Sequence, residues 1–193
     1  GVGFSVEEEN THKLPKIAGR FTDSSTTIVV EDSKEGWASS YRELISLLYA
    51  GIVPKWDVSG IRPEGSRLKT FGGRASGPDP LVELFVFTIN IFKQASGRRL
   101  TTLECHDIMC MIAKIVVVGG VRRSAMISLS DLVDDRMREA KTGMWWETQG
   151  QRAIANNSAV YENRRPDMQV FMKEWKSLYD SKSGERGMFS RYA

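Results

Sequence analysis

A glycine-rich loop is the first stretch of this sequence whose residue types could bind a ligand. It runs from Thr70 to Pro78, reads TFGGRASGP, and leads into an apolar stretch with helical spacing. Glycines let backbone amides approach an oxyanion, a helix N-terminus adds positive partial charge, and an arginine can clamp phosphate bidentately. The spacing is neither a Walker loop nor a dinucleotide fingerprint, so a tight connection without a ligand stays open. The candidate phosphate or substrate contacts are Gly72, Gly73, Arg74 and Ser76.

A second candidate loop places two glycines before two neighbouring arginines, between a predicted buried helix and a predicted strand. Two adjacent guanidinium groups on a glycine hinge suit anion binding or signalling between sites. The loop precedes its strand, whereas the ligand-facing loops of a parallel sheet follow theirs, so a solvated turn is the alternative. The candidate residues are Gly119, Gly120, Val121, Arg122, Arg123 and Ser124.

Polar residues also interrupt a predicted strand at Asn156, Asn157 and Ser158. A buried amide needs hydrogen-bond partners, and either a substrate hydroxyl or a neighbouring strand can provide them. Both interpretations stay open, and Asn156 and Asn157 remain pocket candidates.

The cysteines and histidines do not form a recognisable catalytic or metal site. Cys105 and Cys110 are five residues apart on a predicted helix, roughly 140° around its axis, so they do not readily form a bridge or share a metal. We interpret them as core thiols and predict no metal site. His12 is far away in sequence, and His106, in the first helical turn, is expected in a surface or capping role. We therefore propose no triad.

Alternating strands and helices are expected to position these loops. β-branched or apolar runs predict strands at 26–30, 56–61, 125–130 and 153–161 and near 187. Capping boxes at Asp32 to Glu35 and Thr101 to Glu104 each begin a helix. Apolar spacing predicts helices at 32–50, 81–95, 101–115 and 166–184, and mixed charges indicate another at 131–140. This alternation indicates an α/β protein with a largely parallel sheet.

Composition excludes several classes of protein. The chain has 193 residues, 41% of them hydrophobic and 26% charged, which is typical of a globular protein and not of a disordered or fibrous one. A net charge of +3 does not demand nucleic acid or a membrane as partner. Two cysteines are too few for a secreted disulfide scaffold, so we expect a cytoplasmic protein. The start inside a strand without methionine and the abrupt stop at Ala193 suggest a chain cut at both ends.

Five motifs in order give the chain a family resemblance. They are GVGFSV at 1–6, IRPEG at 61–65, TFGGRASGPDP at 70–80, GVRRSAMISL at 120–129 and NNS at 156–158. Together they resemble adenosylcobalamin-dependent (class II) ribonucleotide reductases of the monomeric ribonucleoside-triphosphate type. The resemblance implies that residues 1–193 are a single segment from the centre of a ten-stranded α/β barrel that includes the specificity-effector region.

The resemblance also implies the chemistry of the complete enzyme. A protein thiyl radical, generated with adenosylcobalamin, reduces the 2′ carbon of a ribonucleotide, and a dithiol such as thioredoxin supplies the electrons. The family's Asn-Pro-Cys-Gly-Glu motif and its first redox cysteine are not in this sequence. We therefore expect no catalytic residue in this chain, no activity by itself, and no necessary contact with the cobalamin.

The matching positions imply a communication role. Arg122 and Arg123 would relay the identity of a deoxynucleoside triphosphate effector to the ribonucleoside triphosphate substrate, with Gly119 and Gly120 as hinge. The remaining portions of the reductase would be partners, whether the enzyme is encoded in pieces or this is an excised piece. The alternatives are a non-catalytic nucleotide-binding regulatory protein and, least favoured, a nucleic-acid binder using the basic loop from Arg62 to Arg74.

Overall fold

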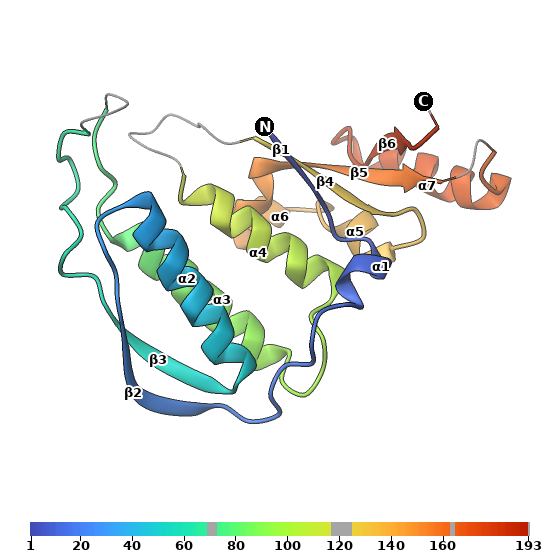
Figure 1. The fold of residues 1–193 in the computed structure, drawn as a ribbon. Helices are drawn as coiled ribbons and strands as arrows, with labels where there is room; N and C mark the ends of the chain where they lie inside the picture. The colour runs from blue at the N-terminus through green and yellow to red at the C-terminus, as the bar shows by residue number, and fades with distance from the viewer. Residues whose placement is uncertain (69–72, 117–124, 163–164, 193) are drawn as a thin grey trace. The chain divides into compact units, whose positions relative to one another are not determined.

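The chain forms two compact units in a computed structural model that describes residues 1–68, 73–116, 125–162 and 165–192 (Figure 1). Unit 1 comprises Gly1–Lys13, Thr101–Ala113 and Ser124–Ala193, and unit 2 comprises Leu14–Leu100 and Lys114–Arg123. Both contain parallel strands connected through helices, which confirms the predicted α/β class. Within the described ranges, no helix is both long and apolar enough to cross a membrane.

Unit 1 contains a four-stranded parallel sheet in the order β1-β4-β5-β6. Its strands are β1 (Val2–Ser5), β4 (Met126–Asp131), β5 (Ala155–Tyr161) and β6 (Gly187–Ser190). The helical segments are α1 (Glu8–Thr11), α4 (Thr102–Lys114, whose last residue belongs to unit 2), α5 (Asp135–Glu139), α6 (Trp145–Thr148), the 3-10 helix η1 (Gly150–Ile154) and α7 (Met168–Ser181). Because every pairing is parallel, the carboxyl ends of all four strands lie at the same edge of the sheet.

Unit 2 is built on a βαβ motif, as its sequence predicts. Strands β2 (Thr22–Val29) and β3 (Ile52–Asp57) pair in parallel, and α2 (Lys34–Tyr49) connects them. Helix α3 (Asp79–Gln94) packs against α2, where the Tyr41 hydroxyl lies 2.9 Å from the Thr88 hydroxyl. The fully buried side chains of this core are Ile28, Leu44, Leu48, Leu81, Leu84, Phe85 and Phe92.

The predicted capping box at Thr101 is confirmed, whereas the predicted cap of α2 is one residue off. At α4, the Glu104 amide donates to the Thr101 hydroxyl at 3.2 Å and the Glu104 carboxylate accepts from the Thr101 amide at 2.8 Å. At α2, the cap is Ser33, whose extended backbone lets its hydroxyl accept from the Gly36 amide at 2.9 Å. Asp32 instead accepts from Arg62 at 2.8 Å.

Several predicted boundaries also differ from the structure. Strand β3 spans Ile52–Asp57 and not the predicted 56–61, because Pro54 is unusual inside a strand and hid its start. Strand β2 begins at Thr22 and not at 26.

Helix α5 is shorter than the predicted 131–140 because Asp131 ends β4 and Asp134 caps the helix, accepting from the Met137 amide at 3.1 Å. Strand β5 begins at Ala155 and not at Ala153, because η1 occupies the residues before it. Mixed charges along 131–140 do not reveal where a strand ends and a cap begins.

A buried ionic cluster fixes α7 to the rest of unit 1. Glu174 of α7 accepts from Arg138 Nε at 2.7 Å and from Arg186 Nε and Nη2 at 2.8 and 2.7 Å. Arg186 also donates to the Asp131 carbonyl at 2.9 Å, and Arg138 pairs with Asp135. Burial opposes ionisation of Glu174, but hydrogen bonds and charge from the two arginines outweigh it and lower the pKa of the carboxyl.

We predict that Glu174→Gln destabilises the protein by about 3–5 kcal/mol, because it leaves two buried guanidinium groups without their shared counter-charge. Chemical denaturation at pH 7 measures this, and Glu139→Gln, at an exposed position of α5, is the matched control. Because the pKa of Glu174 is lowered in the folded state, the difference in stability between wild type and Glu174→Gln should shrink as acid protonates the carboxyl. Equal stability of the two variants would contradict the prediction.

Candidate functional site

Polar side chains gather where the strands of the unit 1 sheet end. Beyond β1, the Glu7 carboxylate is buried and accepts from Arg191 Nη2 at 2.9 and 2.7 Å through its two oxygens. Ser5 donates to Glu7 at 2.6 Å and accepts from the Asn10 side chain at 2.9 Å. The hydrogen bond and charge of Glu7 raise the pKa of Arg191. Ligands of parallel sheets bind at this edge, so the cluster is a candidate site framework.

The sequence analysis did not single out these four residues. Ser5 and Glu7 flank the end of β1, but Arg191 is 184 positions away from Glu7 along the chain. The sequence signal that could have pointed to this cluster is a carboxylate, Glu7, directly after the first predicted strand. The pairing of that carboxylate with the end of β6 depends on the sheet order.

Acidic residues line a groove of about 480 Å³ beyond the end of β4. Asp131 accepts from the Glu8 amide at 2.7 Å, and the Thr102 hydroxyl donates to Asp134 at 2.5 Å. Burial raises the pKa of Asp131, and the neighbouring carboxylates of Glu7, Asp134 and Glu8 raise it further against the opposing Glu8 hydrogen bond. Within the described residues, no three His, Cys, Asp or Glu side chains are grouped to hold a metal ion.

The two predicted asparagine contacts lie on opposite faces of β5. Asn156 is exposed, whereas Asn157 is buried and lies next to Ser128 in the strand register. The backbone amide of Asn157 donates to the Glu185 carboxylate at 3.2 Å. The side-chain Oδ1 of Asn157 has no hydrogen-bond partner among the described residues. Glu185 is held by Lys141 at 2.9 Å. Asn156 is therefore the accessible member of the two, although Ser158 and Val160 on the same face of β5 are buried.

A buried histidine and cysteine lie on the other face of this sheet. His106 Nδ1 is 2.9 Å from the Ser128 hydroxyl and its Nε2 is 3.5 Å from Cys110 Sγ. Phe4 stacks on the ring at 5.9 Å between centroids. The predicted surface or capping role of His106 is wrong, because this face of α4 packs against β4. The core interpretation is confirmed for Cys110, while Cys105 is only half-buried, and both thiols are free.

Both members of this pair are neutral at pH 7. Burial, followed by the charges of Arg152 and Lys141, lowers the pKa of His106 to about 3. Burial, followed by the charge of Asp107, raises the pKa of Cys110 to about 12. A neutral thiol beside a neutral imidazole is not an activated nucleophile, so the pair supports the core of unit 1.

We predict that His106 makes folding acid-sensitive. Its pKa is about 3 in the folded state against 6.5 ordinarily, so the unfolded state binds the proton first as pH falls. The free energy of unfolding should therefore fall by about 1.4 kcal/mol per pH unit across this window. Urea denaturation at a series of pH values should show a flatter profile for His106→Gln than for wild type. His12→Gln, which removes an exposed ring, is the control, and an unchanged profile in His106→Gln would refute the assignment.

The described part of the predicted glycine-rich loop begins at Gly73, and residues 73–75 pair antiparallel with residues 65–68 of unit 2; we call these two paired segments the hairpin. Gly65 and Ala75 are joined by a 2.9 Å backbone hydrogen bond, and Arg74 donates to the Gly65 carbonyl at 2.8 Å. Gly73 has a positive φ of 93°, and the Ser76 hydroxyl is 3.4 Å from the Gly77 carbonyl. Arg74 braces the hairpin with one nitrogen and is otherwise exposed, so it keeps donors available for a ligand.

Several predicted site residues lie outside the described residues. They are Gly72 of the first loop and Gly119, Gly120, Val121, Arg122, Arg123 and Ser124 of the second.

Gly77 fixes the exit from this hairpin. Its φ is +71°, and a Cβ there would meet the Glu64 backbone nitrogen at 3.1 Å. Gly97 has a similar φ of +76° but open space around it. We predict that Gly77→Ala and Gly97→Ala each lose about 1–2 kcal/mol of stability to the left-handed backbone. Gly77→Ala should lose more because of the contact with Glu64. Thermal unfolding measures both, and equal losses would contradict a tight approach.

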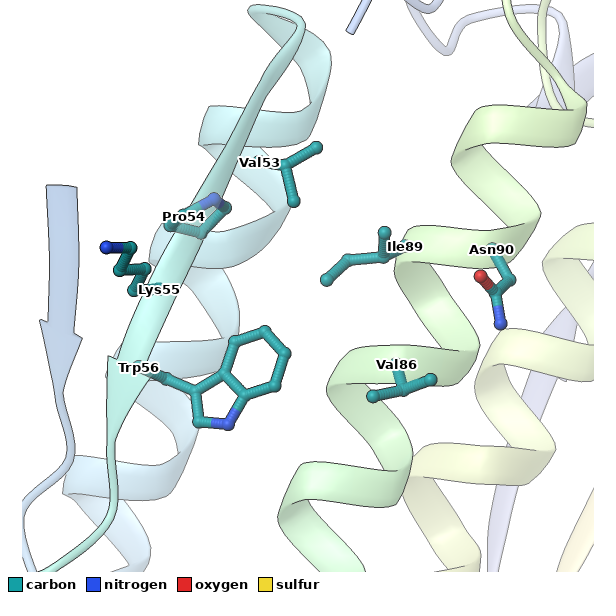
Figure 2. A pocket seen from close by; sticks show the side chains of 7 residues that line it. All are labelled: Val53, Pro54, Lys55, Trp56, Val86, Ile89 and Asn90. Carbon is teal, nitrogen blue, oxygen red and sulfur yellow. The ribbon is translucent and has the colours of Figure 1, made fainter. Parts of the chain in front are cut away.

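Unit 2 also contains an apolar groove of about 530 Å³ between β3 and α3. Figure 2 shows Val53 and Trp56 of β3 facing Ile89 and Val86 of α3, while Lys55 points away from them. The Trp56 ring meets Phe85 edge-on at 5.7 Å. Since the polar side chains do not converge, this groove is an apolar packing surface and lacks the polar groups that orient a nucleotide.

Comparisons with known proteins match this arrangement to one family. The model for the insertion domain of B12-dependent ribonucleotide reductase matches residues 7–92. The adenosylcobalamin-dependent ribonucleoside-triphosphate reductase of Lactobacillus acidophilus is 29% identical over 85% of this chain and 27% of its own length. The enzyme of the same name from Levilactobacillus brevis is 31% identical over 84% of this chain and 27% of its own.

A search of solved structures points to the same family as the sequence matches. The crystal structure of a B12-dependent (class II) ribonucleotide reductase superposes with a TM-score of 0.72 and 25% identity, covering 84% of this chain and 27% of that one. The chain belongs to the B12-dependent ribonucleotide reductase family. It spans about a quarter of the length of the curated relatives it matches. The match agrees with the prediction that the parallel strands are part of the reductase α/β barrel.

Proposed function

We propose that this chain is a portion of an adenosylcobalamin-dependent ribonucleoside-triphosphate reductase, which converts ribonucleotides to deoxyribonucleotides. The observation that carries this is the match to named reductases across 84–85% of the chain, joined to a structural match with a TM-score of 0.72. The chain's contribution is a set of barrel strands and the loops beside them. Its free thiols and the dithiol chemistry of the enzyme suit a reducing cytoplasm.

The unit 1 sheet would supply part of the wall around the substrate. In a parallel sheet, ligands bind beyond the carboxyl ends of the strands, where Glu7 and Arg191 hold two strand ends together. Asn156 is the second residue of β5 and lies near its amino end, so it would be a contact of the ribonucleoside triphosphate separate from the cluster at the carboxyl ends; its exposure is what supports the assignment. Asn157, buried on the opposite face, would support the strand.

The loop with Arg74 would bind nucleotide phosphate, and the loop with Arg122 and Arg123 would respond to the effector. Arg74 and Ser76, beside Gly72 and Gly73, would contact nucleotide phosphate, since Arg74 is exposed and uses only one nitrogen on the hairpin. Arg122 and Arg123 would relay effector identity to the substrate pocket, with Gly119 and Gly120 as the hinge and Val121 and Ser124 beside them. A deoxynucleoside triphosphate is then the effector and a ribonucleoside triphosphate the substrate.

Neither groove described above fits the cobalamin itself. They measure about 530 and 480 Å³, the size of a drug-sized ligand site, and a corrin with its nucleotide tail is larger. Neither groove is lined by histidine or cysteine. We therefore assign the cofactor, the thiyl radical and the dithiol reductant's site to the remaining portions of the reductase.

Reconstitution tests the function. This chain, the polypeptides that carry the rest of the reductase, adenosylcobalamin and a dithiol should together form deoxynucleotides, and omission of this chain should abolish the product. In the same mixture, Arg122→Ala should remove an effector-dependent change in substrate preference of about 5- to 150-fold. Arg20→Ala, which removes an arginine that is exposed in unit 2, should leave this preference unchanged.

Two outcomes would count against the proposal. Effector binding by the mixture without any deoxynucleotide would favour a non-catalytic nucleotide-binding regulator. Full activity without this chain would exclude it from the enzyme.

A further inference from the structure

Helix α7 carries an exposed apolar stripe along its length. Met168, Met172, Trp175 and Tyr179 are 68%, 48%, 47% and 69% exposed, at spacings of four, three and four residues. This spacing places them on one face over three turns. Trp175 and Tyr179 stack with 5.7 Å between centroids and 13° between planes. The fully buried residue of α7 is Glu174, so unit 1 leaves this stripe uncovered.

A groove of about 500 Å³ continues the stripe onto strand β6. Met168 and Phe171 of α7 line one side, and Met188 and Ser190 of β6 line the other. Tyr161, at the end of β5, also lines it, and its buried hydroxyl has no hydrogen-bond partner within the described part of the chain. A buried hydroxyl left unpaired is destabilising, so the groove lacks a hydrogen-bonding group for Tyr161 as well as an apolar partner.

The topology indicates which kind of element fits there. Strands β5 and β6 are parallel neighbours connected through α7, and β6 lies at one of the two edges of the described sheet. When a parallel sheet continues, the next crossover helix packs beside the previous one, over the strand that it follows. The groove between α7 and β6 is at this position. From Met168 to Tyr179 the stripe rises about 16 Å along the helix axis, which matches about three turns of a partner helix.

We propose that the α7 stripe and the groove over β6 bind an amphipathic helix from another portion of the reductase, which also supplies a polar group for the Tyr161 hydroxyl. This inference rests on the proposed function. It is supported by the relatives, of whose length this chain matches only 27%. Lys176 borders the stripe but already donates to Asp180 at 2.5 Å, so we assign it no partner on the docked helix.

Thiol labelling of the complete reductase tests the proposal. Met168→Cys and Met172→Cys probe the stripe, and Gln169→Cys is the matched control, since it is exposed on the same helix but about 100° around from Met168. Labelling with a maleimide is followed at each site by peptide mass spectrometry. We expect Met168→Cys and Met172→Cys to label about tenfold more slowly than Gln169→Cys, because the docked helix must open locally first.

Each other outcome overturns the proposal. Equal labelling at all three positions would mean that no part of the reductase covers the stripe. Protection that appears only as this chain forms dimers, measured by light scattering, would mean that a second copy covers it. Deoxynucleotide formation by the unlabelled preparation is measured in parallel, so failure of this docking surface is separable from failure of the proposed function.

Discussion

The carboxylate of Glu174 is the interaction on which unit 1 most depends. It brings two arginines from different segments to one buried point and ties α7 to α5 and to the residues that lead into β6. Such a cluster tolerates no partial loss, because each removed partner leaves a buried charge unpaired. Since α7 is anchored through a charged side chain, its largest apolar side chains remain outside, where they can bind another part of the reductase.

The parallel sheet explains why polar residues distant in sequence share one edge. Glu7 follows the first strand and Arg191 follows the last, yet their side chains pair at 2.7 Å because all four strands point the same way. The same alternation of faces separates Asn156, which is open, from Asn157, which is buried. On the covered face, His106 and Cys110 are neutral and structural, so the described residues offer pocket walls without an activated nucleophile.

Membership of the reductase family and the physical structure support one another. The relatives identify a class of enzyme, and the structure shows polar clusters at strand ends, an arginine hairpin and an exposed apolar helix face. About three-quarters of a relative's length lies outside the region that this chain matches. A portion that shapes a pocket and binds its neighbours is consistent with the lack of an activated thiol among the described residues.

The α/β class, the βαβ unit, the capping box at Thr101 and the family could be predicted from the sequence, because these depend on local spacing and short motifs. It did not identify Ser33 as a cap, since the choice between Asp32 and Ser33 depends on a backbone angle and on Arg62, thirty residues away. It misplaced His106, because burial depends on which helix face meets the sheet. The Glu7–Arg191 pair, the Glu174 cluster and the uncovered stripe became visible in the folded chain, because each depends on segments that come together on folding.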